Sequence, residues 1–80
     1  MSYTTKIVAI NAAADGRLLG VRLGRLCISV DMPVNLVAKS LDVSKATVYK
    51  WFAGKTDVDK HLRSKAELYY RSLLPPDARS

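Results

Sequence analysis

The sequence predicts an all-α fold, a compact arrangement of four to five helices, and three stretches carry this prediction. In residues 17–29, 34–53 and 58–73, apolar side chains recur every three or four positions, which places them on one face of a helix. The chain has 80 residues, of which 49% are hydrophobic, and this is enough for one small core. We therefore expect a single domain over residues 1–80.

The N-terminal extension, residues 1–15, is the part whose conformation the sequence leaves open. The segment KIVAINAAAD combines β-branched residues with a run of alanines. The alanines favour a short helix over about residues 5–14, which Asp15 and Gly16 would end. A strand over residues 4–10 is the alternative, and the choice matters because such a segment can mediate dimerisation.

The helix expected over residues 17–29 is apolar on two sides. One stripe follows spacings of four, three and four residues, and we assign it to the core. This core stripe consists of Leu19, Leu23, Leu26 and Val30. The nearly opposite stripe consists of Leu18, Val21 and Ile28. We expect it to be covered by the N-terminal segment, through Ile7, Val8 and Ile10, or by another subunit.

Small residues in this helix also call for an explanation. Gly20 and Gly24 are four residues apart, and each lowers helix propensity by about 1 kcal/mol relative to alanine. They either let another backbone approach closely or avoid a clash within the monomer. Cys27 is the single cysteine and cannot form an intramolecular disulfide, so we expect a buried, inert thiol.

Residues 34–54 predict two short helices joined by a sharp turn. Pro33 suits the first position of the first helix. The apolar set of this helix is Leu36, Val37, Ala38 and Leu41, and that of the second is Val48, Trp51 and Phe52. Ser44 is a good N-cap for the second helix, and Gly54 is a typical C-terminal stop. The two helices have the spacing of a helix-turn-helix.

The stretch LGVRLGRLCISVDMPVNLVAKSLDVSKATVYKWFAGK resembles the Cro and lambda-repressor type of helix-turn-helix family, often called XRE-like. The resemblance covers roughly residues 18–70. It is carried by Val37-Ala38, Asp42-Val43-Ser44, Thr47-Val48, Trp51 and Gly54-Lys55. In that family the turn residue is usually Gly in a left-handed conformation, which Asp42 tolerates better than most residues do. The resemblance implies a lambda-repressor-like DNA-binding domain whose second helix enters the major groove.

Residues 44–53 are the expected recognition helix. If its apolar set faces the core, a rotation of 100° per residue puts a different set on the opposite face. This exposed set is Ala46, Tyr49, Lys50 and Ala53, with Lys45 at its flank. The resemblance implies base contacts for Lys45, Ala46 and Lys50, and Tyr49 is our fourth candidate. Lysines donate to guanine and Ala46 meets a thymine methyl in this interpretation; lysine contacts to phosphate alone, or a merely solvated face, are the alternatives.

Phosphate contacts are expected around the same helix pair. Asn35 lies near the start of the first helix, where free backbone N–H groups favour an anion. Ser44 and Thr47 lie in the first turn of the second helix. The resemblance implies a backbone contact for Lys55, whereas Val34 replaces a glutamine frequent in the family, so that contact is missing here.

The last helix is expected over about residues 58–73. Its buried stripe is Val58, Leu62, Ala66, Tyr69 or Tyr70, and Leu73. Thr56 or Asp57 should cap it, with Asp59 completing a pair that resembles a capping box. Leu68 falls outside the stripe and is a candidate dimer contact. Residues 75–80 form a short polar tail.

The net charge of +6 favours an anionic partner, and with the helix-turn-helix this partner is expected to be double-stranded DNA. We expect a small phage- or prophage-type transcription regulator, repressor-like, that binds a palindromic operator as a homodimer. Control would come from its concentration, its degradation, or an antirepressor or other protein partner. The alternative is a helix-turn-helix protein used as a protein-interaction module or inhibitor, or as a DNA-packaging recognition subunit.

Other classes of function lack a sequence pattern. There is no paired-carboxylate spacing, no Cys-His or Ser-His-Asp set and no glycine-rich phosphate loop, so we expect neither an enzyme nor a cofactor. His61 is alone, which predicts no metal site. No stretch has the length and apolarity of a membrane span or the layout of a signal peptide. A cytoplasmic protein, in a bacterial host cell or at its nucleoid, is expected.

Overall fold

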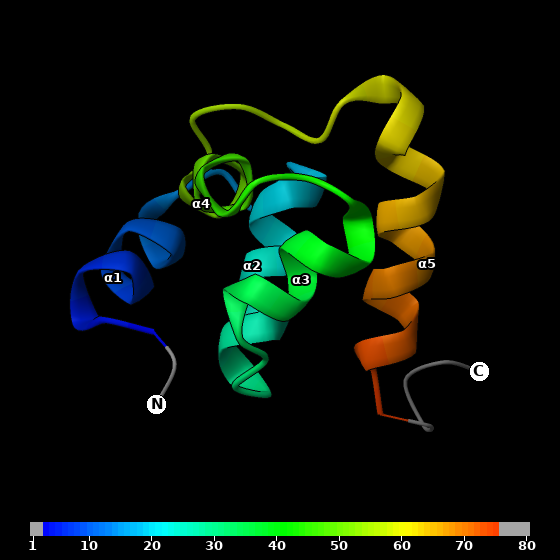
Figure 1. Cartoon of the computed structure of the whole chain (residues 1–80). Coiled ribbons are helices and arrows are strands. Elements are labelled where there is room, and N and C mark those ends of the chain that lie inside the picture. The colour runs from blue at the N-terminus through cyan, green and yellow to red at the C-terminus, as the bar shows by residue number, and fades with distance from the viewer. Residues whose placement is uncertain (1–2, 76–80) are drawn as a thin grey trace.

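Five α-helices make up the computed structural model, which describes residues 3–75 (Figure 1). They are α1 (Thr5–Ala13), α2 (Leu19–Ser29), α3 (Val34–Leu41), α4 (Lys45–Ala53) and α5 (Arg63–Leu73), with a 3-10 helix, η1 (Lys60–Leu62), before α5. The described residues contain no strand. The all-α prediction and the helix over about residues 5–14 are therefore confirmed, and the alternative strand over residues 4–10 is wrong. Most of the expected tail, residues 76–80, lies outside the described residues.

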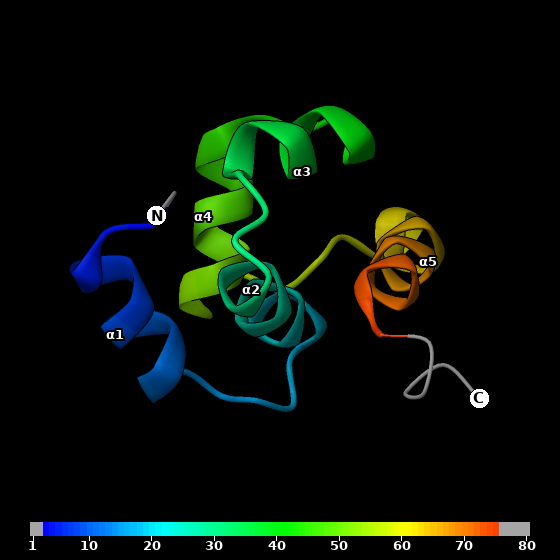
Figure 2. The ribbon, with the colours of Figure 1, turned by 90° about the horizontal axis from the view of Figure 1, so that it is seen from below.

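Helix α2 is the centre of a compact globule. It packs against α1, α4 and α5, while α3 packs against α4. Figures 1 and 2 show α1 and α5 on opposite sides of α2, with α3 and α4 above it in Figure 2. No helix in the described part of the chain is long and apolar enough to cross a membrane.

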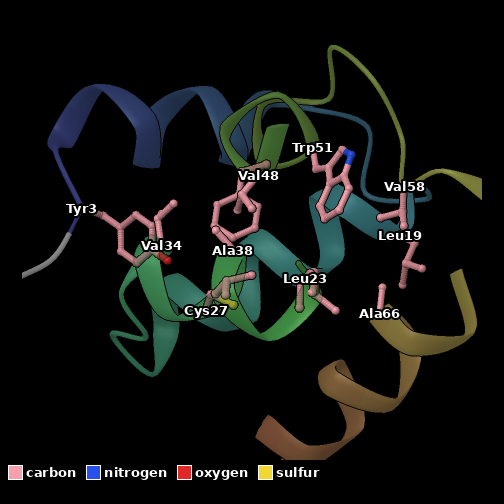
Figure 3. Packing of buried hydrophobic residues seen from close by; sticks show 13 residues of the cluster. Tyr3, Leu19, Leu23, Cys27, Val34, Ala38, Val48, Trp51, Val58 and Ala66 are labelled. Carbon is pink, nitrogen blue, oxygen red and sulfur yellow. The ribbon is translucent and has the colours of Figure 1, made fainter. Parts of the chain in front are cut away.

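The core gathers around the contact between α2 and α4. Its largest fully buried side chains are Trp51, Phe52, Leu23, Leu41, Val21, Val37, Val48 and Cys27. Val48 and Trp51 point from α4 into the cluster that holds Leu23 and Cys27 (Figure 3). The expectation of a buried Cys27 is confirmed, and burial raises the pKa of its thiol to about 12, which disfavours the reactive thiolate.

The two glycines of α2 allow α4 to pack closely. A Cβ added at Gly20 would lie 2.7 Å from the Cβ of Trp51, and one at Gly24 would lie 2.7 Å from the Cγ of Phe52. Such distances are far below van der Waals contact. The two interpretations offered by the sequence therefore hold together: the glycines let the backbone of α4 approach closely, and they avoid a clash within the monomer.

The second apolar side of α2 packs against α1, as expected, but the predicted contribution of Ile10 is wrong: Ile7 and Val8 are half-buried, whereas Ile10 is 38% exposed. Val21 is fully buried. Asn11 of α1 is only 2% exposed, and its Nδ2 donates to the carbonyl oxygens of Val21 (3.2 Å) and Phe52 (2.8 Å). Arg25 of α2 closes the C-terminal end of α1, because its Nη2 donates to the carbonyl of Ala14 at 2.9 Å. Basic groups at a helix C-terminus donate to free carbonyls and interact favourably with the negative end of the helix dipole.

Three details of the expected core and of a helix start are wrong. Val30 is 47% exposed because α2 ends at Ser29 and the chain leaves the helical path there. Leu36 is 45% exposed, because α3 buries a stripe that begins at Val34 and does not include it. The members of this stripe are Val34, Val37, Ala38 and Leu41. Pro33 is the N-cap of α3, with ψ of 141°, and not its first helical residue.

The predicted start of the last helix is also wrong. Residues 57–59 are not helical, and α5 begins only at Arg63 without a side-chain cap. Asp57 caps a different helix, because its Oδ1 accepts from the backbone N–H of Gly20 at 3.0 Å, at the start of α2. The buried stripe itself is largely confirmed: Val58 and Ala66 are buried, and Leu62, Tyr69, Tyr70 and Leu73 are half-buried. Leu68 is 67% exposed.

Candidate nucleic-acid interface

The turn between α3 and α4 has the conformation that the sequence predicts. Asp42 is left-handed, with φ of 57° and ψ of 48°. The N–H of Val43 donates to the carbonyl of Ala38 at 3.0 Å, which satisfies a free carbonyl at the end of α3. Aspartate is among the few non-glycine residues that adopt this conformation at modest cost. The departure from glycine at this position therefore preserves the turn.

Both ends of α4 are closed by local interactions. The Ser44 hydroxyl accepts from the N–H of Thr47 at 3.2 Å, and the two hydroxyls of these residues lie 2.9 Å apart. At the other end Gly54 adopts φ of 76°, a value that suits glycine. Both predicted boundaries of α4 are confirmed. Ser44 and Thr47, expected to contact phosphate, are thus also hydrogen-bonded to each other.

One face of α4 is exposed while the opposite face is locked into the core. Val48, Trp51 and Phe52 are buried almost completely. The four residues expected to contact bases lie together on the other face: Lys45, Ala46 and Lys50 are exposed, and Tyr49 is 40% exposed. The structure brings the predicted base-contacting residues together on a helix that cannot rotate without disrupting the core.

The residues expected to contact phosphate are distributed around this face. Asn35 is exposed and is the second residue of α3. Lys55 is exposed just after α4, and its N–H closes that helix by donating to the carbonyl of Lys50 at 3.0 Å. Thr47 is half-buried, whereas Val34 is buried and presents no polar group to a ligand.

An open cleft separates α4 from α1, and the sequence did not predict it. We call it the α1–α4 cleft; its volume is about 240 Å³. Its lining consists of Thr4, Lys6, Ile7, Ile10, Tyr49, Lys50, Ala53 and Lys55. Tyr49 and Lys50 therefore belong both to the exposed face of α4 and to the cleft. Lys6 is a candidate site residue that sequence reasoning missed, because only the packing of α1 beside α4 brings it here.

The charge around the cleft is of one sign. The lining contains three lysines and no carboxylate. Two ion pairs occur within residues 3–75, Arg17–Asp15 and Arg63–Asp57, and neither involves a lysine of the cleft. The Arg17 guanidinium lowers the pKa of the Asp15 carboxyl through hydrogen bonds. The lysines of the cleft and of α4 therefore direct uncompensated positive charge to solvent.

The described residues contain no cluster of three His, Cys, Asp or Glu side chains that would hold a metal ion. Comparison of the chain with protein-family models, curated proteins and solved structures gave no match. The functional inference therefore depends on the geometry and charge of α3, α4 and the cleft.

Proposed function

We propose that the protein is a small sequence-specific transcription regulator, repressor-like, that binds double-stranded DNA with α4 in the major groove. In this proposal the fold is a lambda-repressor-like DNA-binding domain with α3 and α4 as its helix-turn-helix. One observation carries it: Lys45, Ala46, Tyr49 and Lys50 share an exposed face of α4, whose other face is fixed in the core. A helix fits the major groove, and its rigid attachment fixes which side chains meet the bases.

The chemistry of the face supports base recognition. Lys45 and Lys50 would donate to O6 and N7 of guanine, and the methyl of Ala46 would contact a thymine methyl. Tyr49 would stack on a sugar or donate to a phosphate. Asn35, Lys55 and the hydroxyls of the first turn of α4 would position the protein on the backbone. The net charge of +6 supplies the sequence-independent part of the affinity.

The biological setting is part of the proposal. We propose a homodimer on a palindromic operator, in the cytoplasm, with half-sites one helical turn apart. An antirepressor or other protein partner would relieve binding.

The test is selection of bound duplexes from a random pool at near-physiological salt. Enrichment of an inverted repeat supports a dimeric regulator, and a single short motif supports monomeric binding. The Lys45→Glu/Lys50→Glu variant should enrich nothing, whereas the matched variant Lys60→Glu/Lys65→Glu, which changes the same charge near α5, should retain the motif. If the unaltered protein enriches no sequence, the proposal is contradicted.

A second candidate is a protein-interaction module or a DNA-packaging recognition subunit with the same helix pair. The exposed apolar side chains of Leu36 on α3 and Leu68 on α5 favour it, because a protein partner would remove them from water. Loss of affinity with rising salt does not separate the two functions, since non-specific DNA binding shows it too. Discrimination between DNA sequences at fixed salt does.

A further inference from the structure

The lining of the α1–α4 cleft contains three lysines from two separate parts of the chain. Lys6 reaches it from α1, while Lys50 and Lys55 come from α4 and the segment that follows. Lys6 is 44 residues from Lys50 and 49 from Lys55 in the sequence, so packing and not local sequence brings it beside them. With no carboxylate in the lining, their mutual repulsion is relieved only by solvent ions or by an anionic ligand.

The rest of the lining is mainly apolar. Ile7 and Ile10 come from α1, and Tyr49 and Ala53 from α4. Ile10 is 38% exposed. A ligand that complements this surface alternates anionic groups with apolar ones. A nucleic-acid strand has this pattern, because each phosphate is followed by a sugar with a largely apolar face.

The cleft is continuous with the face of α4 that we assign to the bases. Tyr49 and Lys50 belong to both surfaces. A duplex whose bases met that face would carry one of its strands past the opening of the cleft. This continuity favours DNA over a small anionic ligand, since a separate ligand would compete with DNA for Lys50.

We propose that the α1–α4 cleft binds one sugar–phosphate strand of duplex DNA, with Lys6 supplying a phosphate contact from α1. The inference rests on the proposed function and extends it to a helix outside the helix-turn-helix. Lys6 contributes affinity for any sequence and no base discrimination, because phosphates carry no sequence information.

The position of α1 is fixed well enough for this contact. Asn11 joins α1 to both α2 and α4 by hydrogen bonds to Val21 and Phe52, and Arg25 holds its C-terminal end. Before α1 begins, the Tyr3 hydroxyl donates to the carbonyl of Met32. Because these bonds hold α1 at several points, Lys6 stays near α4 before DNA arrives, and little ordering entropy is lost on binding.

The experiment compares Lys6→Ala with Lys65→Ala, which removes an equal charge from an exposed position on α5 outside the cleft. Affinity for a duplex is measured by fluorescence anisotropy over a range of salt concentrations. Lys6→Ala should reduce the slope of log affinity against log salt by about 1. Loss of one phosphate contact lowers affinity roughly fivefold at 0.15 M salt, by the same factor for selected and scrambled duplexes. Lys6→Arg should restore the slope.

The outcomes separate this inference from the proposed function. If the unaltered protein binds its selected duplex and Lys6→Ala matches Lys65→Ala, the strand-binding cleft is refuted while the function stands. A loss confined to the selected duplex would also refute it, because Lys6 would then read sequence. If the unaltered protein binds no duplex, the proposed function fails, and this inference fails with it.

Discussion

Two grooves, one between α1 and α4 and one between α2 and α5, contain basic residues in different surroundings. The α1–α4 cleft has three lysines and no carboxylate. On the other side, the groove between α2 and α5 is lined by Leu19, Arg22, Glu67, Tyr70, Arg71 and Leu74. There the Arg22 guanidinium carbon lies 5.3 Å from the centre of the Tyr70 ring, a cation–π distance, and Glu67 supplies a negative charge.

The comparison shows that the net charge of +6 does not by itself locate an anion-binding surface. In the groove beside α5, Arg22 contacts the Tyr70 ring, and Arg22 and Arg71 share the lining with the carboxylate of Glu67. In the α1–α4 cleft the lysines face solvent with no acidic neighbour in the lining. Whether a basic side chain stabilises a bound anion depends more on the groups next to it than on the number of basic residues in the chain.

The largest expected effect tests the packing beneath the cleft, where α1, α2 and α4 meet. Gly24→Ala should lower the free energy of unfolding by about 3 kcal/mol, because the new Cβ would meet the buried ring of Phe52 at 2.7 Å. Gly16→Ala is the comparison, since its Cβ would meet the end of the Arg25 side chain and not a buried ring; the guanidinium must shift at the end of α1, and a loss of about 1 kcal/mol is expected. Urea denaturation measures both. Equal effects of the two substitutions would contradict the close approach of α4 to α2.

A smaller loss is expected when the bridge across the three helices is removed. Asn11→Ala leaves the Phe52 carbonyl without its side-chain donor, which should cost about 2 kcal/mol of stability. The same variant should weaken DNA binding, because α1 and Lys6 are then less firmly held beside α4. Urea denaturation and anisotropy measure the two effects. A destabilised variant with unchanged affinity would show that the position of α1 does not matter for binding.

Two lysines of the cleft should differ in what their removal changes. Lys50→Ala is expected to cost about 1.5 kcal/mol of discrimination at one base position, through loss of contacts to a base edge. Lys55→Ala should weaken binding to all duplexes about equally and reduce the salt slope by about 1. Selection and anisotropy with each variant measure these effects. If neither variant changes binding, the proposed orientation of α4 on DNA is wrong.

The smallest effect concerns the groove on the opposite side of α2. Arg22→Ala removes the cation–π contact with Tyr70 and should lower stability by about 0.5 kcal/mol. The slope of log affinity for DNA against log salt should be the same for this variant as for the unaltered protein, because Arg22 faces the groove beside α5. A reduced slope would show that DNA also contacts this side, which would remove the distinction between the two grooves.

Local patterns predicted the helix pair better than they predicted its surroundings. Ser44, Asp42 and Gly54 act within one turn of their own helices, so periodicity and capping preferences were sufficient. The cleft depends on Asn11, whose bond to Phe52 spans 41 residues. A lone amide inside a run of apolar residues and alanines is a weak signal of such a bridge, and it does not indicate which carbonyl groups the amide binds.

The errors have related causes. Leu36 belongs to the apolar set predicted for α3, but it is one residue from Val37, a rotation of 100° on a helix, and this turns it away from the buried stripe. Asp57 was expected to cap the last helix, and it caps α2 instead because the chain folds back beside the start of that helix. Capping residues are recognisable from sequence, whereas the helix that they cap depends on tertiary packing.

In the proposed function, the exposed face of α4 and the α1–α4 cleft together form the DNA-binding surface. Amide chemical shifts recorded by NMR during titration with a duplex, at low salt where backbone contacts are strongest, test it most directly. We expect the largest changes at Lys6, Ala46, Tyr49 and Lys50, with the exposed positions of α5 nearly unchanged. Changes concentrated on α5, or none at a saturating concentration of duplex, would contradict it.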